Sequence, residues 1–561
     1  GWRCRNLTEC DYNLLDEEWI PVLLTDGGVE KVGILKAFER AYDIEDLACE
    51  LPTQKIAIQR VLLAICYRVV SLEDEEDWGD LWRAGLPMEA IRVYLEKWRD
   101  RFYLFGGRHP FMQAPDLRTP KGAVSGLERI VADVPNGERQ LFTTRHGRAL
   151  KRITPAEAAV WVIHTQAYDP AGIRSGAVGD DGMKKGKGYS IGPAWCGQTG
   201  AVWLRGDNLR ETLMLNLVVA DTVCLQGPSP QSDEAACTWE SEAVETAVRR
   251  DYSRDGKPDP NGIGIPRLLT WHSRRMRLHG DRDGVTGVVL AQGDKLGPQN
   301  MQRFEPMSLW RYSQPQSKKF KEHVYMPAKH EPGRAFWRNL PSTLPVTEKI
   351  PGFDKQEQQK FQQSATLLFQ THLKTLELDF PARIRLEAVG MTYDDENESC
   401  VKDLYHDQMT LAKVLLEEEG KALAYSVKQQ VLTVEEVAKA VGILGANLSR
   451  AAGESGDGAG EGAQKRAKER FFAQIDDPFR SWLASLDGNS DVENKQREWT
   501  ETARRIAKQV AGELIASAPR SATTGRNTGK TYMSSGIAEN FFNKELNKTL
   551  PPTNSMKGEN K

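Results

Sequence analysis

The last third of the sequence carries four stretches in which apolar residues recur at helical spacing, and no other feature limits the fold as strongly. Within each stretch the apolar residues fall at i, i+3, i+4 and i+7, which is typical of a helix that buries one face. Helices of this kind, joined by short connections, favour an antiparallel bundle. The four stretches are residues 404–427, 434–452, 463–486 and 492–517.

The remainder of the chain alternates short helical segments and short strands with long connections rich in glycine and proline. At 561 residues the chain is too long for one ordinary core, so two or more domains are expected. We therefore expect an α+β protein with a large mixed N-terminal domain with long functional loops (1–400), a C-terminal four-helix bundle (401–549) and a disordered tail (550–561). Asp26-Gly27-Gly28 predicts a β-hairpin, and Pro52 the start of a buried helix.

Composition excludes several classes of protein. Hydrophobic residues make up 40% and charged residues 27%, as in a globular protein, and the net charge of −3 excludes a polycation. Nucleic-acid binding would have to come from local patches. The eight cysteines include no C-x-x-C pair, which indicates reduced thiols and no zinc ribbon. No apolar run approaches 18 residues and no signal-peptide pattern is present, so we expect a cytoplasmic protein with no membrane partner.

A glycine-rich stretch, residues 168–192, is the first candidate binding element. Six glycines lie between Gly172 and Gly188, interspersed with Arg174, Lys184, Lys185 and Lys187. Glycines let backbone approach a ligand closely, and cations suit phosphate. The pattern is not G-x-G-x-x-G, which disfavours a Rossmann site. A phosphate-binding loop and an ordinary surface loop remain equally compatible with this composition.

Two basic segments are weaker candidates. Residues 303–325 interleave cations with aromatic residues, which suits base stacking but also describes an edge strand with one buried face. Residues 144–152 form a further basic cluster.

No catalytic constellation is recognisable. Residues 525–531 resemble a phosphate-binding P-loop but have three residues between the glycines where four are required. His109, His164 and His272 have no partners at metal-ligand spacing, and Cys196 has no identifiable activating base. The sequence therefore predicts no catalytic residue, no metal site and no cofactor.

An acidic stretch, residues 391–403, precedes the predicted bundle. Its spacing partly matches a calcium-binding EF-hand loop, but Cys400 stands where the obligatory glycine belongs. On its own chemistry the stretch predicts a solvated turn, with Ser399 as a possible N-cap of a following helix.

Two short motifs carry a resemblance to a known family. "NLLDEEWIPV" (13–22) and "GRHPFMQ" (107–113) are similar to segments of the CasA family, the large subunit of the type I-E CRISPR surveillance complex Cascade. The order of the later segments also resembles that family, from about Tyr12 to Leu550.

The resemblance implies a function and a set of partners. It implies a non-catalytic subunit that recognises the protospacer-adjacent motif in double-stranded target DNA and promotes strand separation for pairing with the CRISPR RNA. The implied partners are the CRISPR RNA, the other Cascade subunits (backbone, small and RNA-processing) and the helicase-nuclease. Two alternatives remain open, namely a stand-alone nucleic-acid-modifying enzyme and a purely structural scaffold subunit.

The resemblance also implies positions for the binding residues. The family's glycine loop corresponds to residues 170–176, where Gly172, Ser175 and Gly176 would bring backbone against the minor groove and Arg174 would meet a phosphate. The loop near the RNA handle corresponds to residues 131–137, with Asp133 and Asn136 as its polar candidates. A basic finger is assigned to Arg303.

A strand-separating wedge is implied at Asn397-Glu398-Ser399, followed by a helix containing His406 and Asp407. The family has glutamine where this chain has Glu398, so a carboxylate replaces an amide of similar shape. The neighbouring acidic residues 394–396 suggest a further hypothesis, that their charge keeps the parted strands from reannealing.

Overall fold

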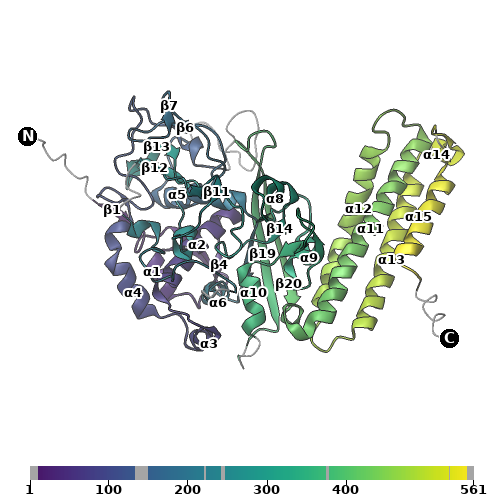
Figure 1. Cartoon of the computed structure of the whole chain (residues 1–561), viewed down its shortest axis with the longest axis horizontal. Coiled ribbons are helices and arrows are strands. Elements are labelled where there is room, and N and C mark those ends of the chain that lie inside the picture. The colour runs from purple at the N-terminus through teal and green to yellow at the C-terminus, as the bar shows by residue number, and fades with distance from the viewer. Residues whose placement is uncertain are drawn as a thin grey trace, which may run out of the picture. The chain divides into compact units, whose positions relative to one another are not determined.

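The computed structural model describes residues 10–132, 150–219, 223–241, 247–373, 378, 380–529 and 531–552. The chain forms two compact units, and each is made from more than one segment of the sequence. The first unit contains residues 1–334, 347–380 and 385–408, and the second contains residues 335–346, 381–384 and 409–561. Figure 1 labels the elements along the chain. The boundaries predicted at residues 400 and 549 stay predictions.

The first unit begins with two small antiparallel sheets. β1 (Asp11–Asn13) pairs with β5 (Tyr103–Phe105), while β2 (Ile20–Leu24) lies between β3 (Val29–Val32) and β4 (Ile44–Leu47). β2 and β3 form the predicted hairpin, because Asp26 accepts a hydrogen bond from the N–H of Gly28 (2.8 Å) and Gly27 adopts a positive φ of 88°.

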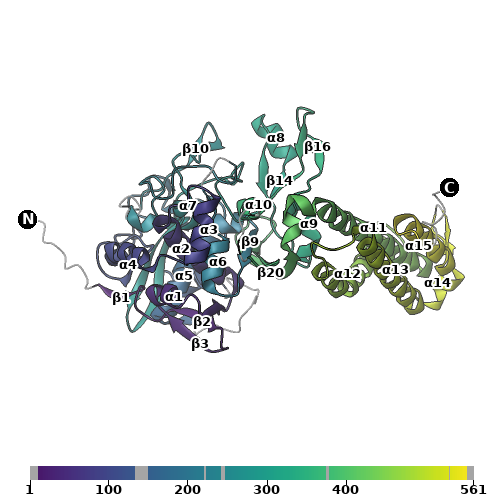
Figure 2. The ribbon, with the colours of Figure 1, turned by 90° about the horizontal axis from the view of Figure 1, so that it is seen from below.

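A helical core lies beside these sheets. α2 (Pro52–Val69) starts at Pro52 as predicted and is buried along almost its whole length. It packs against α4 (Met88–Lys97), α5 (Pro155–Tyr168), α6 (Leu209–Leu215) and α7 (Ile265–Leu269), so it has no solvent face and carries no amphipathic pattern (Figure 2). The helices α1 (Ile34–Glu39) and α3 (Glu75–Ala84) complete this region.

Three further sheets carry the segments predicted to bind nucleic acid. β12 (Arg274–Asp281) and β13 (Gly284–Gln292) form a long hairpin. Beside β13 lies a three-stranded sheet in the order β6 (Arg174–Ser175), β8 (Lys187–Gly188), β7 (Met183–Lys184). Figure 1 draws these strands close together. The third sheet has the order β20 (Val401–Ala412), β19 (Arg383–Tyr393), β9 (Ala201–Arg205).

The basic segment 303–325 is not an edge strand. Its strand β14 (Trp310–Tyr312) lies between β15 (Tyr325–Pro327) and β18 (Phe361–Gln362), and its lysines lie on α8 (Gln314–Phe320) and just beyond it. The remaining short elements are β10 (Ser253–Arg254), β11 (Lys257–Pro258), β16 (Lys349–Pro351), β17 (Glu357–Gln359) and α10 (Ala365–His372).

In the part of the chain that the structure describes, the second unit contains a bundle of four long helices with the short helix α14 (Arg520–Thr524) beside them, which confirms the predicted α+β class with a C-terminal bundle. The helices differ from the predicted ones at both ends of the bundle. The first predicted helix begins as strand β20, its last residues join the second predicted helix in the single helix α11 (Lys421–Ala452), and α15 was not among the predicted helices. The long helices are α11 (Lys421–Ala452), α12 (Glu461–Ala484), α13 (Val492–Ser517) and α15 (Ser535–Thr549).

A short segment from the middle of the sequence completes the bundle. It comprises the 3₁₀ turn Phe336–Asn339 and α9 (Leu340–Thr343). Trp337 stacks on Phe479 of α12 with ring centroids 4.1 Å apart, and its indole N–H donates to Asp476 (2.6 Å). Arg338 forms two hydrogen bonds with Glu435 of α11 (2.7 and 2.9 Å). The helical core of this unit is therefore discontinuous in sequence.

Candidate nucleic-acid interface

The glycine loop starts at the end of α5, where one carboxylate holds two arginines. Asp169 Oδ2 accepts hydrogen bonds from Arg174 Nη2 (2.7 Å) and from Arg274 Nε of β12 (2.5 Å). Both guanidinium groups also donate to the carbonyl of Pro170 (2.5 and 3.0 Å). Charge-assisted bonds of this kind are strong and directional, so the first turn of the loop is fixed to the β12 strand.

The guanidinium group of Arg174 therefore already has hydrogen-bond partners within the chain. Its side chain is 9% exposed, and its guanidinium bonds to Asp169 and to backbone carbonyls. A contact from Arg174 to a DNA phosphate would require it to exchange these partners. In this conformation it holds the loop in place.

Gly172 has its backbone bound on both sides. Its N–H donates to Ser190 Oγ (3.0 Å), and its carbonyl accepts from Gln292 Nε2 of β13 (2.9 Å). The residue adopts a φ of +124°, and an added Cβ would lie 3.2 Å from Arg174 Nη1. Glycine is therefore favoured here, and its backbone is partly exposed.

Ser175 and Gly176 lie in and after the short strand β6. Ser175 is half-buried and pairs with Lys187 of β8. Gly176 is buried, and a Cβ there would come within 2.4 Å of the Gly186 carbonyl oxygen and of Met183 Sδ. Its glycine is explained by close packing inside the small sheet.

The acidic turn between β19 and β20 is organised by Asp394. One carboxylate oxygen accepts from the N–H groups of Glu396 (3.2 Å) and Asn397 (3.0 Å), and the other accepts from the N–H of Cys400 (2.8 Å). These backbone hydrogen bonds, that of Asn397 first, lower the pKa of Asp394 to about 2. Residues 394–396 are therefore not simply a repulsive flank, because Asp394 builds the turn.

The helix expected after the wedge is absent. Residues 401–412, which include His406 and Asp407, form strand β20. Their side chains alternate between buried and exposed over much of the strand, as strand period 2 requires. His406 Nε2 lies 2.8 Å from Glu387 Oε1 on the neighbouring strand β19, so these two side chains are hydrogen-bonded across the sheet.

The structure brings the glycine loop and the acidic turn together. The N–H of Ala171 donates to the carbonyl of Glu398 (2.8 Å), and the hydroxyl of Tyr393 donates to the carbonyl of Tyr168 (2.7 Å). Glu398 adopts a positive φ of 54°, and its carboxylate pairs with Lys329 Nζ at 3.4 Å while 47% of the side chain stays exposed. Gly172 and residues 397–399 therefore belong to one surface.

The other predicted residues are placed differently. The carbonyl of Arg303 accepts from the N–H of Gln226 (2.7 Å), and the adjacent Phe304 ring lies close to Gly227. Arg303 thus sits in a segment packed on residues 226–227. Asp133 and Asn136 lie outside the described residues.

Sequence reasoning missed the residues that hold the loop: Asp169, Ser190, Arg274 and Gln292. Asp169 and Arg274 are 105 positions apart in the chain. Only the fold brings the ends of α5 and β12 together, so no local pattern could have paired them.

Two groups of types that often serve in catalysis have strongly shifted pKa values in this chain. Burial lowers the pKa of His164 to about 3 and raises that of the Cys196 thiol to about 11. Among the described residues, no three His, Cys, Asp or Glu side chains are grouped to hold a metal ion. No helix in the same residues is both long and apolar enough to cross a membrane.

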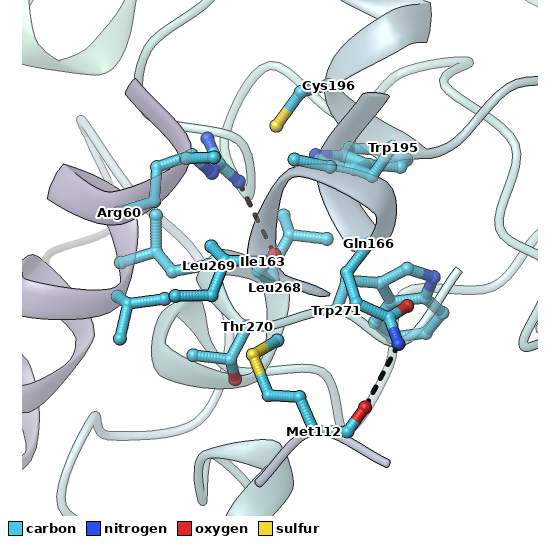
Figure 3. A pocket seen from close by; sticks show the side chains of 13 residues that line it. Arg60, Met112, Ile163, Gln166, Trp195, Cys196, Leu268, Leu269, Thr270 and Trp271 are labelled. Atoms are coloured by element: carbon cyan, nitrogen blue, oxygen red, sulfur yellow. Dashed lines mark hydrogen bonds between the residues drawn. The ribbon is translucent and has the colours of Figure 1, made fainter. Parts of the chain in front are cut away.

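A small cavity lies between α2, α5 and α7 (Figure 3). Its volume is about 20 Å³, enough for about one water molecule. On its wall Arg60 donates to the carbonyl of Leu268 (3.3 Å) and pairs with the buried Glu305, which also accepts from the Trp195 indole N–H (2.6 Å). Its size and buried ion pair fit a structural role.

Comparison with known proteins gives a consistent result. The family described as CRISPR-associated protein Cse1 matches residues 13–510. The curated CasA/Cse1 protein of Thermus thermophilus is 30% identical over 343 residues, which span 60% of each chain.

Solved structures extend the likeness over nearly the whole chain. The crystal structure of Thermobifida fusca Cse1 is 36% identical with a TM-score of 0.84, covering 96% of this chain and 98% of that one. Cse1 from Acidimicrobium ferrooxidans is 25% identical with a TM-score of 0.79, covering 97% and 100%. A chain of a CRISPR RNA-guided surveillance complex shares the fold at 18% identity, with a TM-score of 0.66 and coverage of 96% and 99%.

Proposed function

The chain belongs to the Cse1 family of CRISPR-associated proteins, and from that premise we propose that it is the non-catalytic large subunit of a type I-E Cascade complex. In this role it recognises the protospacer-adjacent motif in duplex DNA and promotes strand separation, so that the CRISPR RNA can pair with its target. It assembles with the CRISPR RNA and the backbone, small and RNA-processing subunits, and helps to recruit the helicase-nuclease in antiviral defence.

One observation carries the recognition proposal: the hydrogen bond from the Ala171 N–H to the Glu398 carbonyl. Two segments more than 200 positions apart, each singled out for DNA contact, are thereby held as one surface. Gly172 adds no side chain of its own to this surface, which allows close approach to the minor groove, about 6 Å wide, while its N–H and carbonyl stay bonded to Ser190 and Gln292. Readout there distinguishes mainly A·T from G·C pairs, so a short and partly degenerate motif is expected.

Glu398 is the proposed wedge. A wedge acts by occupying the space of a stacked base pair, and Glu398 projects from a turn that Asp394 and Ala171 hold in place. A bare carboxylate would repel phosphate, but the ion pair with Lys329 offsets that charge. We assign Arg174 a positioning role, through Asp169, in place of a direct phosphate contact.

Asp133 and Asn136 remain the proposed contacts to the RNA handle, and Arg303 the proposed basic finger. These assignments rest on the family resemblance.

The test is binding of duplexes with randomised bases beside a fixed target to Cascade reassembled with and without this chain. A two- or three-base preference should appear only with the chain, and Gly172→Val and Glu398→Ala should each weaken it. Gly512→Ala is the matched control, because a Cβ at Gly512 meets open space and its backbone does not adopt a positive φ. Equal binding to duplexes with any bases beside the target would show that the chain is a structural scaffold. Turnover of nucleic acid by the isolated protein would show that it is an enzyme.

A further inference from the structure

A hollow of about 600 Å³ opens directly beside the glycine loop. Ser190 belongs to its wall and also accepts the N–H of Gly172 (3.0 Å). Gln292 Nε2 donates to the carbonyls of both Gly172 (2.9 Å) and Gly188 (3.3 Å), so the wall and the loop are held by the same groups. The volume lies within the range of about 300–1,000 Å³ that is usual for small-ligand sites.

Four cations line this hollow, and two of them have carboxylate partners. Arg249 pairs with Asp180 (2.9 Å) and Lys295 pairs with Asp251 (3.0 Å). The carboxylates of Asp181 and Asp251 also face the hollow.

The other two cations, Lys184 and Arg250, are exposed. Neither has a carboxylate within 4 Å among the residues that the structure describes. They are available for an anion from outside the chain.

Lys184 is positioned by a β-hairpin. It lies in the hairpin formed by β7 and β8, whose two turn residues, Lys185 and Gly186, adopt positive φ angles of 51° and 74°. Two such residues form the tight turn that matches the twist of the flanking strands. β8 in turn pairs with β6 of the glycine loop.

An aromatic ring completes the hollow. Tyr189 lines it and is 47% exposed, between Gly188, which is bound to Gln292, and Ser190, which is bound to Gly172. Exposed aromatic rings beside cations are the usual platform for single-stranded nucleic acid, because a base stacks on the ring while phosphates meet the cations. A base within a duplex has no free face for such stacking.

We propose that this hollow binds one unpaired nucleotide of single-stranded DNA, with its base on Tyr189 and the flanking phosphates on Lys184 and Arg250. The inference rests on the proposed function, because strand separation at the glycine loop would supply the unpaired nucleotide beside the hollow. The hollow thereby holds the parted strand and slows its return to the duplex.

The first measurement is photo-crosslinking. Cascade containing the full chain is irradiated with a short oligothymidine that carries 5-iodo-deoxyuridine, and the crosslinked peptide is sequenced. The crosslink should map to Tyr189 and disappear in Tyr189→Ala. Crosslinks confined to other residues would overturn the proposal.

The second measurement is anisotropy with the same oligothymidine, labelled with fluorescein. Tyr189→Ala should weaken binding by about 5- to 150-fold, the range for loss of one stacked base, whereas Tyr189→Phe should retain it. Lys184→Gln with Arg250→Gln should lower the slope of log affinity against log salt by about 1.4. Lys31→Gln with Lys36→Gln, the same change of charge on exposed residues of β3 and α1, is the matched control.

The outcomes separate this inference from the proposed function. If Tyr189→Ala binds as the wild type does while the lysine and arginine changes weaken duplex binding, the surface contacts duplex phosphates and the nucleotide site is wrong. If the flank preference is absent but the Tyr189 crosslink persists, motif recognition fails and the nucleotide site stands.

Discussion

At the scale of single residues, Asp394 has the most specific role, because its carboxylate closes the acidic turn through hydrogen bonds on both oxygens. Asp394→Asn leaves one acceptor oxygen, so the N–H groups of Asn397 and Cys400 cannot both be satisfied. Hydrogen exchange at these two amides should become faster. Asp395→Asn is the control, since Asp395 bonds only to the Lys402 side chain (2.7 Å), and equal exchange in both variants would contradict the assignment.

The same carboxylate predicts a dependence on pH. Its pKa is lowered from 3.8 to about 2 in the folded protein, so its contribution is complete above about pH 4 and is lost as the pH falls through 2. Exchange protection of the Cys400 amide should therefore differ between wild type and Asp394→Asn at neutral pH, and the difference should narrow near pH 2. A difference that persists unchanged there would exclude the carboxylate as its cause.

A third residue-scale prediction concerns the buried ion pair between Arg60 and Glu305. Their side chains are 4% and 1% exposed, so removal of one partner leaves an uncompensated buried charge. Arg60→Met should lower the free energy of unfolding by about 3–5 kcal/mol in denaturant titrations. Arg92→Met, which breaks an exposed pair with Glu39, should cost less than about 1 kcal/mol. Similar losses in both variants would show that burial is not the cause.

At the scale of elements, the sheet of β6, β8 and β7 links the glycine loop to the lysine-bearing hairpin. Gly176→Ala places a Cβ within 2.4 Å of the Gly186 carbonyl oxygen, so the strands must separate. Overpacking of this kind costs about 1–3 kcal/mol, which thermal unfolding would detect. The flank preference of reassembled Cascade should fall with it, whereas Gly512→Ala, on helix α13 with open space around its Cβ, should keep the preference. A preference unchanged by Gly176→Ala would separate the sheet from recognition.

The sequence predicted some elements well and others poorly, for physical reasons. α2 and the hairpin at Asp26 follow local rules, a proline at a helix start and an Asx turn, and both were predicted. Strand β20 was predicted as helix because Tyr405, Met409 and Ala412 fall at i, i+4 and i+7, which fits a helical period over this short window. What decided the outcome was pairing with β19, which is a tertiary contact.

In the candidate site, too, local features could be predicted from the sequence and tertiary contacts could not. The glycine loop and the acidic turn could be located from composition and resemblance, because their residue types are distinctive. The contact between them could not, since Ala171 and Glu398 meet only after β19 and α5 have packed. Nor could the ion pair between Arg174 and Asp169 be inferred, because a sequence does not distinguish a free cation from a paired one.

At the scale of the whole molecule, the chain returns twice to each compact unit, so no single cut in the sequence separates them. This bears on the boundary predicted at residue 400. A fragment that begins there retains the four long helices but lacks residues 335–346, and with them the Trp337 ring on Phe479 and the Arg338–Glu435 pair. The exposed face left on α12 would be apolar, which lowers stability and favours aggregation.

The fragment 409–552 should therefore unfold at a lower temperature than the same helices do in the full chain, and a peptide of residues 335–346 added in trans should raise its melting temperature. Loss of a buried tryptophan costs about 3 kcal/mol or more, which corresponds to roughly 10 °C for a unit of this size. The peptide with Trp337→Ala is the matched control and should raise the melting temperature less, because it lacks the stacked ring and the indole hydrogen bond to Asp476. If the fragment alone melts as the intact unit does, the inserted segment is a passive connection and the boundary near residue 400 marks an independent domain.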